Sequence, residues 1–453
     1  MGVDSLKMAV LVLTIIGIIG VWRYPRYFLP ALIFSLPMDI SQTWFPHLSW
    51  LDKLGSYIGV ITFARIFSLA FIAYYLVCLV RNRLRRNQWG GLYQGSIFGQ
   101  DELIWRTSLF IALVGYLGYG LLSAIWSVNP LQSVVQSVRL VVLLFLGFAA
   151  YTQMVKDHSQ WLVLQSFSIA STLHGLVGIF EMITNRFLWN GDIYQAAGRI
   201  NGTFVDANIY ARFLVIGILA TLIWMIARRD RWGNLFGALA LMIQLIALVG
   251  TGSRTGWVCA LFALLFLTLL VPRKQILIVL VGGAAAAIVA VAIHPEFLVR
   301  LADLRKGLAV ASLERQYLIQ AGWDMFIHHP GLGVGLGGFE TMMFTYYPDL
   351  IHNNISLSHT ALLTTAAELG IIGVLGVGAV FVIIYRELIL SWSKRKLLAG
   401  ISGIPQNWLL TVFTVLSITV IFISAQGEGR FFEDPALWIF AGLLMALRRV
   451  EEV

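Results

Sequence analysis

The sequence has few charged residues. Only 12% of its 453 residues are Asp, Glu, Lys or Arg, and 58% are hydrophobic. In a typical soluble domain about a quarter of the residues are charged. The apolar residues come in long continuous runs, without the alternation that marks a transmembrane β-barrel. This composition excludes an ordinary soluble protein and predicts an all-α, polytopic membrane protein.

Cysteine is also scarce, and several other features are missing. The two cysteines, Cys78 and Cys259, both lie within apolar runs, so we predict neither a disulfide nor a metal-binding framework. The sequence shows no heptad repeat, low-complexity tail or appended soluble domain. Residues 1–22 lack an Ala-x-Ala-like cleavage site, and we therefore expect a retained first helix rather than a removed signal peptide.

Apolar runs long enough to cross a bilayer recur along the chain. A spanning helix needs about 20 apolar residues, and we predict about 12 transmembrane helices, or about 13 if the first two short runs form separate helices. The motif RYPR, Arg23 to Arg26, separates these two runs. The predicted spans are residues 8–22, 27–40, 57–80, 104–126, 138–155, 160–183, 208–227, 234–250, 255–271, 275–293, 359–385, 407–425 and 434–448.

Basic residues fall on alternate connections between these runs. Because short connections rich in Lys and Arg stay on the cytoplasmic side, the pattern places the C-terminus in the cytoplasm. The basic connections are Arg81 to Arg86, Lys156, Arg228 to Arg231, Pro272 to Lys274, Arg386 to Lys396 and Arg448-Arg449. The connections expected on the outer face are residues 41–56, 127–137, 184–207, 251–254, 294–358 and 426–433.

The longest polar interruption divides the chain into three predicted parts. Residues 1–293 and 359–453 would form two sets of transmembrane helices, and residues 294–358 a large, partly helical periplasmic loop. The glycine-rich stretch Gly331 to Gly338 lacks the βαβ context of a dinucleotide loop, so we predict a tight turn there. The histidines of the loop have no Glu or Cys partner at zinc spacing, so we predict no metal site.

Several arginines fall on the outer side, against the bias for positive charge inside. Arg254 lies in the short connection TGSRTG, and Arg212 lies inside a predicted span. Charges at membrane depth are costly and usually functional, and the arginine fork suits phosphate. Two alternatives remain open: Arg212 pairs with Asp206 or Glu181, and Arg254 reaches lipid phosphates. The other outer arginines are Arg199, Arg300, Arg305, Arg315 and Arg430.

One histidine has a distinctive position. His359 begins the apolar run HTALLTTAAELGIIG, at the outer end of a predicted helix. Such a histidine can be neutral near pH 7 and accept a proton; the alternative is a polar residue at the helix end that binds water. Glu368 lies about two and a half helical turns deeper, where it would orient the histidine or pack against a neighbouring helix.

Three blocks, taken together, resemble the O-antigen ligase and O-antigen polymerase superfamily of bacterial membrane glycosyltransferases. They are RINGTFVDANIYA, then SRTG at an outer turn, and then PGLGVGLGGF in the large loop followed by a histidine and LLxxxxELGIIG. The resemblance covers roughly residues 195–380. It implies a GT-C-like fold and a metal-independent, inverting glycosyltransferase without a cofactor.

The resemblance also implies roles for individual residues. Arg199 and Arg254 match family arginines that face the donor diphosphate, and Arg315 matches a loop arginine placed before the Pro-Gly-Leu-Gly segment. His359 matches the histidine proposed to activate the acceptor hydroxyl. The chain departs from the family at Asp206-Ala207-Asn208, where a central proline is common. The further candidates are Arg212 for the diphosphate, and Asn208 and Glu368 in supporting positions.

The implied reaction lies on the periplasmic face of the bacterial inner membrane. The donor would be an undecaprenyl-diphosphate-linked glycan, and the acceptor lipid A–core for a ligase or another glycan for a polymerase. We favour the ligase, and we expect no nucleic-acid partner. A lipid or polysaccharide transporter is the main alternative, but the sequence lacks the internal repeat typical of many transporters. A non-catalytic scaffold would not need outer arginines.

Overall fold

The computed structural model describes residues 15–38, 62–88, 107–187, 198–228, 230–271, 313–346, 358, 360–398, 405–429 and 431–452. Within these ranges the chain forms helices joined by short connections and contains no strand. The predicted all-α class is therefore confirmed for this part of the chain.

Eight of the described helices are long and apolar enough to cross a membrane. They are α4 (Phe63–Gln88), α5 (Ser108–Leu122, continued by the 3-10 helix η4, Ser123–Ile125), α6 (Pro130–Asp157), α7 (Gln160–Thr184), α9 (Ala207–Arg228), α10 (Arg231–Gly250), α17 (Ala361–Leu398) and α18 (Gln406–Ala425). Two shorter apolar helices, α11 (Arg254–Leu270) and α19 (Pro435–Glu452), coincide with two further predicted spans. The polytopic membrane class is confirmed, and the total of about 12 spans stays a prediction.

The N-terminal region differs from its predicted span at residues 27–40. The 3-10 helix η1 (Pro25–Tyr27) leads into α2 (Phe28–Ser35), which has only 8 residues. Eight helical residues extend about 12 Å, far less than the roughly 30 Å of a hydrocarbon core. α2 ends just before Pro37, which has no N–H to continue a helix. It packs against α4 and α7 instead of crossing the membrane alone. The predicted span 275–293 lies outside the described residues.

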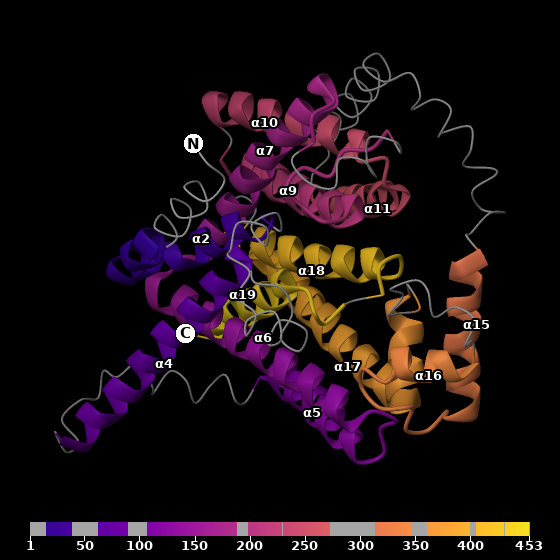
Figure 1. Cartoon of the computed structure of the whole chain (residues 1–453). Coiled ribbons are helices and arrows are strands. Elements are labelled where there is room, and N and C mark those ends of the chain that lie inside the picture. Colours follow the sequence, from indigo (N-terminus) through magenta and orange to yellow (C-terminus); the bar gives the residue numbers. More distant parts are fainter. Residues whose placement is uncertain are drawn as a thin grey trace.

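Helices α9 and α18 form the centre of the molecule (Figure 1). In each, 89% of the most apolar window is buried inside the protein. Both sequences are apolar over most of their length, a pattern that suits contact with protein as well as contact with lipid. Helices α7, α10 and α11 pack against α9, while α11, α17 and α19 pack against α18.

A buried polar cluster joins three of these helices. The amide nitrogen of Gln244 in α10 donates to Ser171 Oγ and Thr172 Oγ1 of α7, at 2.8 and 2.9 Å. The amide oxygen accepts from Thr221 Oγ1 of α9 at 3.2 Å. Bonds of this kind between membrane helices contribute about 1 kcal/mol each. They fix α10 against α7 and α9, and thereby fix the turn that follows α10.

Connections that were predicted to share the outer face meet at one end of the bundle. Hydrogen bonds run from Ile200 N to the Gly250 carbonyl, from Val128 N to the Val334 carbonyl and from Leu362 N to Gln426 Oε1. At this end α15 (Leu313–His328) and α16 (Phe339–Tyr346) lie beside the first turns of α17 (Figure 1). The described part of the large connection thus contains two helices, joined by a non-helical segment at residues 329–338.

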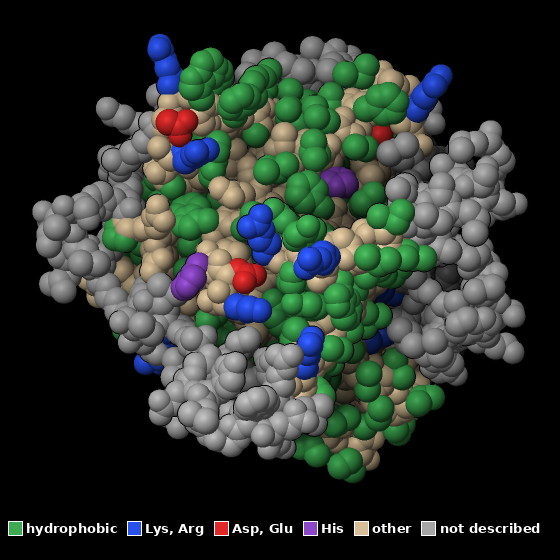
Figure 2. All heavy atoms as spheres, turned by 90° about the vertical axis from the view of Figure 1, so that its left-hand side faces the viewer, with side chains coloured by type: hydrophobic (Ala, Val, Ile, Leu, Met, Phe, Trp, Pro, Cys, Tyr) green, Lys and Arg blue, Asp and Glu red, His purple; other side chains and the backbone are tan. Residues whose placement is uncertain are grey.

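The molecule exposes many hydrophobic side chains, as a protein surrounded by lipid does. Leu261 of α11, and Leu375 and Val382 of α17, are 64–69% exposed. Figure 2 shows one face on which hydrophobic side chains predominate, with several Lys and Arg and fewer Asp and Glu among them.

Candidate functional site

The connection between α10 and α11 is a tight, well-capped turn. Gly252 adopts φ +59°, a conformation that glycine tolerates best. Ser253 is the N-cap of α11, and its hydroxyl accepts a hydrogen bond from Gly256 N at 3.1 Å. Thr251 Oγ1 accepts from Ser253 N at 3.2 Å. The sequence TGSRTG therefore fixes the first turn of α11, where Arg254 begins the helix.

Arg199 is bonded to this turn. Its Nε donates to the Thr251 carbonyl at 2.8 Å, and its Nη2 donates to Asn208 Oδ1 at 2.9 Å. The same Asn208 oxygen accepts from Ser253 Oγ at 2.8 Å. Three separate segments are thus joined: the connection before α9, the first turn of α9 and the start of α11. Two predicted site residues, Arg199 and Asn208, are in direct contact.

The start of α9 is held by a local cap in place of the family's common proline. Asp206 Oδ1 accepts from Asn208 N at 2.5 Å, the local bond by which Asp favours helix starts and turns. The preceding segment is tied to α7, where Glu181 Oε2 accepts from Gly202 N at 2.7 Å. Asn208 is therefore positioned without the proline. The Glu181 carboxylate accepts from a backbone N–H and does not pair with Arg212.

Arg254 differs from Arg199 because its side chain is exposed. Among the described residues, no side chain or carbonyl is seen bonded to its guanidinium. It lies at the N-terminus of a helix of 17 residues, where the outward N–H groups carry partial positive charge. An accessible guanidinium beside a helix N-terminus, next to Ser253, is a suitable place for an anion.

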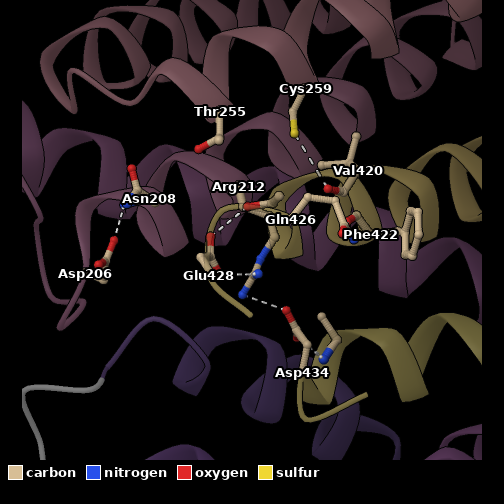
Figure 3. Close-up of polar contacts among 12 residues, drawn as sticks. Asp206, Asn208, Arg212, Thr255, Cys259, Val420, Phe422, Gln426, Glu428 and Asp434 are labelled. Carbon is tan, nitrogen blue, oxygen red and sulfur yellow. Dashed lines mark hydrogen bonds and ion pairs between the residues drawn. The ribbon is translucent and has the colours of Figure 1, made fainter. Parts of the chain in front are cut away.

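Arg212 is almost fully buried and pairs with two carboxylates (Figure 3). Its Nη1 lies 2.7 Å from Glu428 Oε2, and its Nη2 lies 2.8 Å from Asp434 Oδ2. Ser424 Oγ donates to the other Glu428 oxygen at 2.7 Å. Burial raises the pKa of the Glu428 carboxyl, and Arg212 and Ser424 counteract only part of this rise. An acidic pairing was one alternative for Arg212, but its partners are not the two residues that the sequence suggested.

The glycine-rich stretch packs into a break in α17. Gly370 has the non-helical angles φ +61° and ψ −160° inside that helix. A Cβ on Gly333, itself at φ +73°, would lie 2.3 Å from the Glu368 carbonyl oxygen. A Cβ on Gly370 would lie 2.3 Å from the Gly331 carbonyl oxygen. The predicted tight turn is confirmed, and it serves to bring two backbones into contact.

Glu368 lies two residues before this break. Its side chain is buried, and its Oε1 accepts from Phe339 N at 3.4 Å, at the start of α16. A carboxylate is favourable at a helix N-terminus. Of the two roles considered for Glu368, contact with a neighbouring helix is the one that the structure displays.

Two predicted site residues lie wholly or partly outside the described residues. His359 lies outside the described residues, as does the side chain of Arg315, although the backbone of Arg315 belongs to α15. The neighbouring Ser358 is buried, and its Oγ accepts from Thr360 N at 3.1 Å. Sequence reasoning missed Ser253, Glu428 and Gln426. The acidic residues of the last outer connection, GEGRFFED, were the signal for an arginine partner there.

Among the residues that the structure describes, no three His, Cys, Asp or Glu side chains lie close enough to hold a metal ion.

The fold and this site define a polytopic helical membrane protein with arginines gathered at one end. Residues 237–378 match a family model described as O-antigen ligase. No curated protein that was compared matches the chain. This match supports the resemblance to the O-antigen ligase and polymerase superfamily over residues 237–378.

The matched segment contains Arg254, α15, α16 and the first part of α17. Arg199, Asn208 and Arg212 precede it in the sequence. The bonds from Arg199 to Thr251 and from Ser253 to Asn208 tie these earlier residues to the matched segment. The candidate site therefore combines Arg254, which lies within residues 237–378, with Arg199 and Arg212, which precede them.

Proposed function

We propose that this protein is a membrane glycosyltransferase that moves a glycan from an undecaprenyl-diphosphate carrier to a sugar hydroxyl, and that it acts as an O-antigen ligase with lipid A–core as acceptor. The family match supports a ligase or polymerase in general. The site would lie on the periplasmic side of the inner membrane, because its connections are those that the basic loops assign to the outer face.

The observation that carries the proposal is the exposed Arg254 beside the Arg199–Asn208–Ser253 cluster. A lipid diphosphate needs positive charge and N–H donors, and Arg254 with the first turn of α11 offers both. Arg199 adds a second guanidinium and holds the turn through Thr251. Arg315 and Arg212 complete the set that we propose near the diphosphate, although the Arg212 guanidinium is already bonded to Glu428 and Asp434.

The proposed reaction is a single displacement. The acceptor hydroxyl oxygen attacks the anomeric carbon, the bond from that carbon to the diphosphate oxygen breaks, and the configuration inverts. His359 would take the hydroxyl proton, a contribution of about 10²–10⁴-fold for a general base. The arginines would stabilise the negative charge that develops on the departing diphosphate without a divalent ion. Glu368 would act indirectly, by holding α16 against α17.

The chain provides a matched control for testing Arg254. Arg231 is also exposed and also begins a helix, α10, whose N-cap Asp230 accepts from Gly233 N at 2.8 Å. It lies at the other end of that helix, about 30 Å from the turn that leads to Arg254. The two arginines therefore share exposure and a place at the start of a helix, and differ in location and in the N-cap residue beside them.

We expect Arg254→Ala to lower kcat/KM for the donor about 10- to 100-fold, because a charge-assisted hydrogen bond contributes about 1.5–3 kcal/mol. Arg231→Ala should stay within about twofold of wild type. The assay is glycan transfer by purified protein in nanodiscs, with lipid A–core or additional donor as acceptor. Equal transfer by both variants would remove Arg254 from the mechanism. Product made only from additional donor would identify a polymerase.

A further inference from the structure

Three consecutive residues after α18 contact three different helices. Gln426 Oε1 accepts from Leu362 N of α17 at 3.2 Å. Glu428 forms the 2.7 Å ion pair with Arg212 of α9. Between them, Gly427 lies so close to α11 that an added Cβ would be 2.9 Å from Thr255 Cγ2. Figure 3 shows Gln426 and Glu428 beside Arg212, with Thr255 nearby.

We propose that the turn Gln426–Glu428 is a positioning element, which holds the first turn of α17 at a fixed place relative to α9 and α11. This proposal rests on the proposed function. In that function, α11 begins with the diphosphate-binding Arg254, and the candidate base His359 precedes Ala361, the first residue of α17, by two positions. The turn would thus align donor and acceptor.

Gln426 makes the contact with α17. The first N–H groups of a helix have no partner within the helix, so Leu362 N depends on an outside acceptor. The Gln426 nitrogen donates to the Phe422 carbonyl at 2.9 Å. These two bonds fix the amide orientation, because the reversed amide would place NH₂ against N–H and oxygen against oxygen. Gln426 is thus a specific bridge from the end of α18 to the start of α17.

Glu428 anchors the same turn to α9. Its two carboxylate oxygens are bonded to Arg212 and Ser424, both at 2.7 Å. Its side chain is only 10% exposed. Moving the turn relative to α9 would separate buried opposite charges, which is strongly unfavourable. The turn that is bonded to the start of α17 is therefore itself fixed relative to α9.

The turn Gln426–Glu428 should therefore affect kcat rather than the binding of the donor. A displacement of about 1 Å between reacting groups can slow a reaction about 100-fold, even when it arises away from the chemistry. Arg254 would still bind the diphosphate if the start of α17 shifted. The expected signature is a lower kcat with an unchanged KM for the donor.

The test compares Gln426→Met with Gln426→Glu in the full-length protein in nanodiscs. Methionine has a similar length but cannot accept from Leu362 N, whereas glutamate can, and a negative charge suits a helix N-terminus. We expect Gln426→Met to lower kcat at least tenfold with a donor KM within about twofold of wild type, and Gln426→Glu to retain most of kcat. Hydrogen exchange should rise at the start of α17 in Gln426→Met alone.

Two outcomes distinguish failure of the positioning proposal from failure of the proposed function. If wild type transfers glycan and Gln426→Met matches it in kcat and hydrogen exchange, the positioning proposal is overturned and the proposed function stands. If wild type transfers nothing from donor to either acceptor, the proposed function fails and the positioning proposal falls with it. A Gln426→Met variant that raises only the donor KM also overturns the positioning role.

A second pair of variants examines the contact with α11. Gly427→Ala should lower kcat because the new Cβ meets Thr255 Cγ2. Thr255→Ser removes that methyl group and keeps the hydroxyl, which lies 3.1 Å from Ser253 Oγ. The double variant should therefore recover most of the kcat lost in Gly427→Ala. A double variant as slow as Gly427→Ala would overturn this contact as a source of alignment.

Discussion

Arg212 allows a structural role to be separated from a substrate-binding role. It was predicted at the donor diphosphate, and its guanidinium is bonded to Glu428 and Asp434. Arg212→Met would leave two carboxylates, each 10% exposed, without their shared cation. Removing one partner of a buried pair costs about 3–5 kcal/mol. Because total stability is typically about 5–15 kcal/mol, this loss should be large and easily measured.

A compensated variant decides between the roles. In Arg212→Met/Glu428→Gln/Asp434→Asn no charge of the cluster remains, and neutral replacement of buried ion pairs is often tolerated. If Arg212 acts only through the cluster, stability should return and the donor KM should match that of wild type. If Arg212 also binds the donor diphosphate, stability should return while the donor KM stays raised.

The assay is reversible unfolding in detergent micelles together with donor kinetics in nanodiscs. Arg386→Met, which removes an exposed arginine from α17, serves as the control and should change stability by less than about 0.5 kcal/mol. Arg212→Met that unfolds within about 1 kcal/mol of wild type would refute the reasoning, because the carboxylates would then not depend on the guanidinium.

Two further predictions concern pH and backbone conformation. The folded protein raises the pKa of Glu428 above its usual 4.5, so its contribution to stability is full below that value and is lost as the pH rises through the folded-state pKa. Glu428→Gln should flatten that part of the pH–stability curve, and an unchanged curve would contradict the raised pKa. Gly333→Ala should cost about 2–4 kcal/mol in unfolding free energy, from positive φ and overlap with Glu368. Gly331→Ala, which meets nothing within 4 Å, should be nearly neutral, and equal losses would contradict the close backbone contact.

Most of the long helices could be predicted from the sequence, because a continuous apolar run in a membrane satisfies its backbone hydrogen bonds by forming a helix. The prediction failed at residues 27–40, where Pro37 ends α2 early and the apolar residues pack against α4 and α7. The sequence also did not show which helices lie at the centre of the protein and which lie at its surface. α9 and α18 are central because of which neighbours surround them, and apolar runs that face lipid look the same as runs that face protein.

Charge placement could be predicted, but charge partners could not. The basic connections and the small number of outer arginines identified Arg199, Arg212 and Arg254 before any contact was known. The partners of Arg212 lie 216 positions away at Glu428 and still further away at Asp434, so only tertiary packing reveals them. Arg212 lies inside a predicted span and Arg254 in a short connection, but neither location shows which arginine is paired with carboxylates.

The histidine that opens the run HTALLTTAAELGIIG was predicted at the end of one continuous span. Gly370 interrupts that helix, and the glycine-rich stretch occupies the interruption. The turns before Gly370 therefore form a separate short segment, bonded to Gln426 at one end and packed against Gly333 near the other. If the depth of a straight helix set the position of the candidate base, changes in span length would move it. With the break, protein contacts hold the turns of α17 that follow the candidate base, and substitutions at Gln426 and Gly333 should lower glycan transfer more than those on the lipid-facing turns of α17.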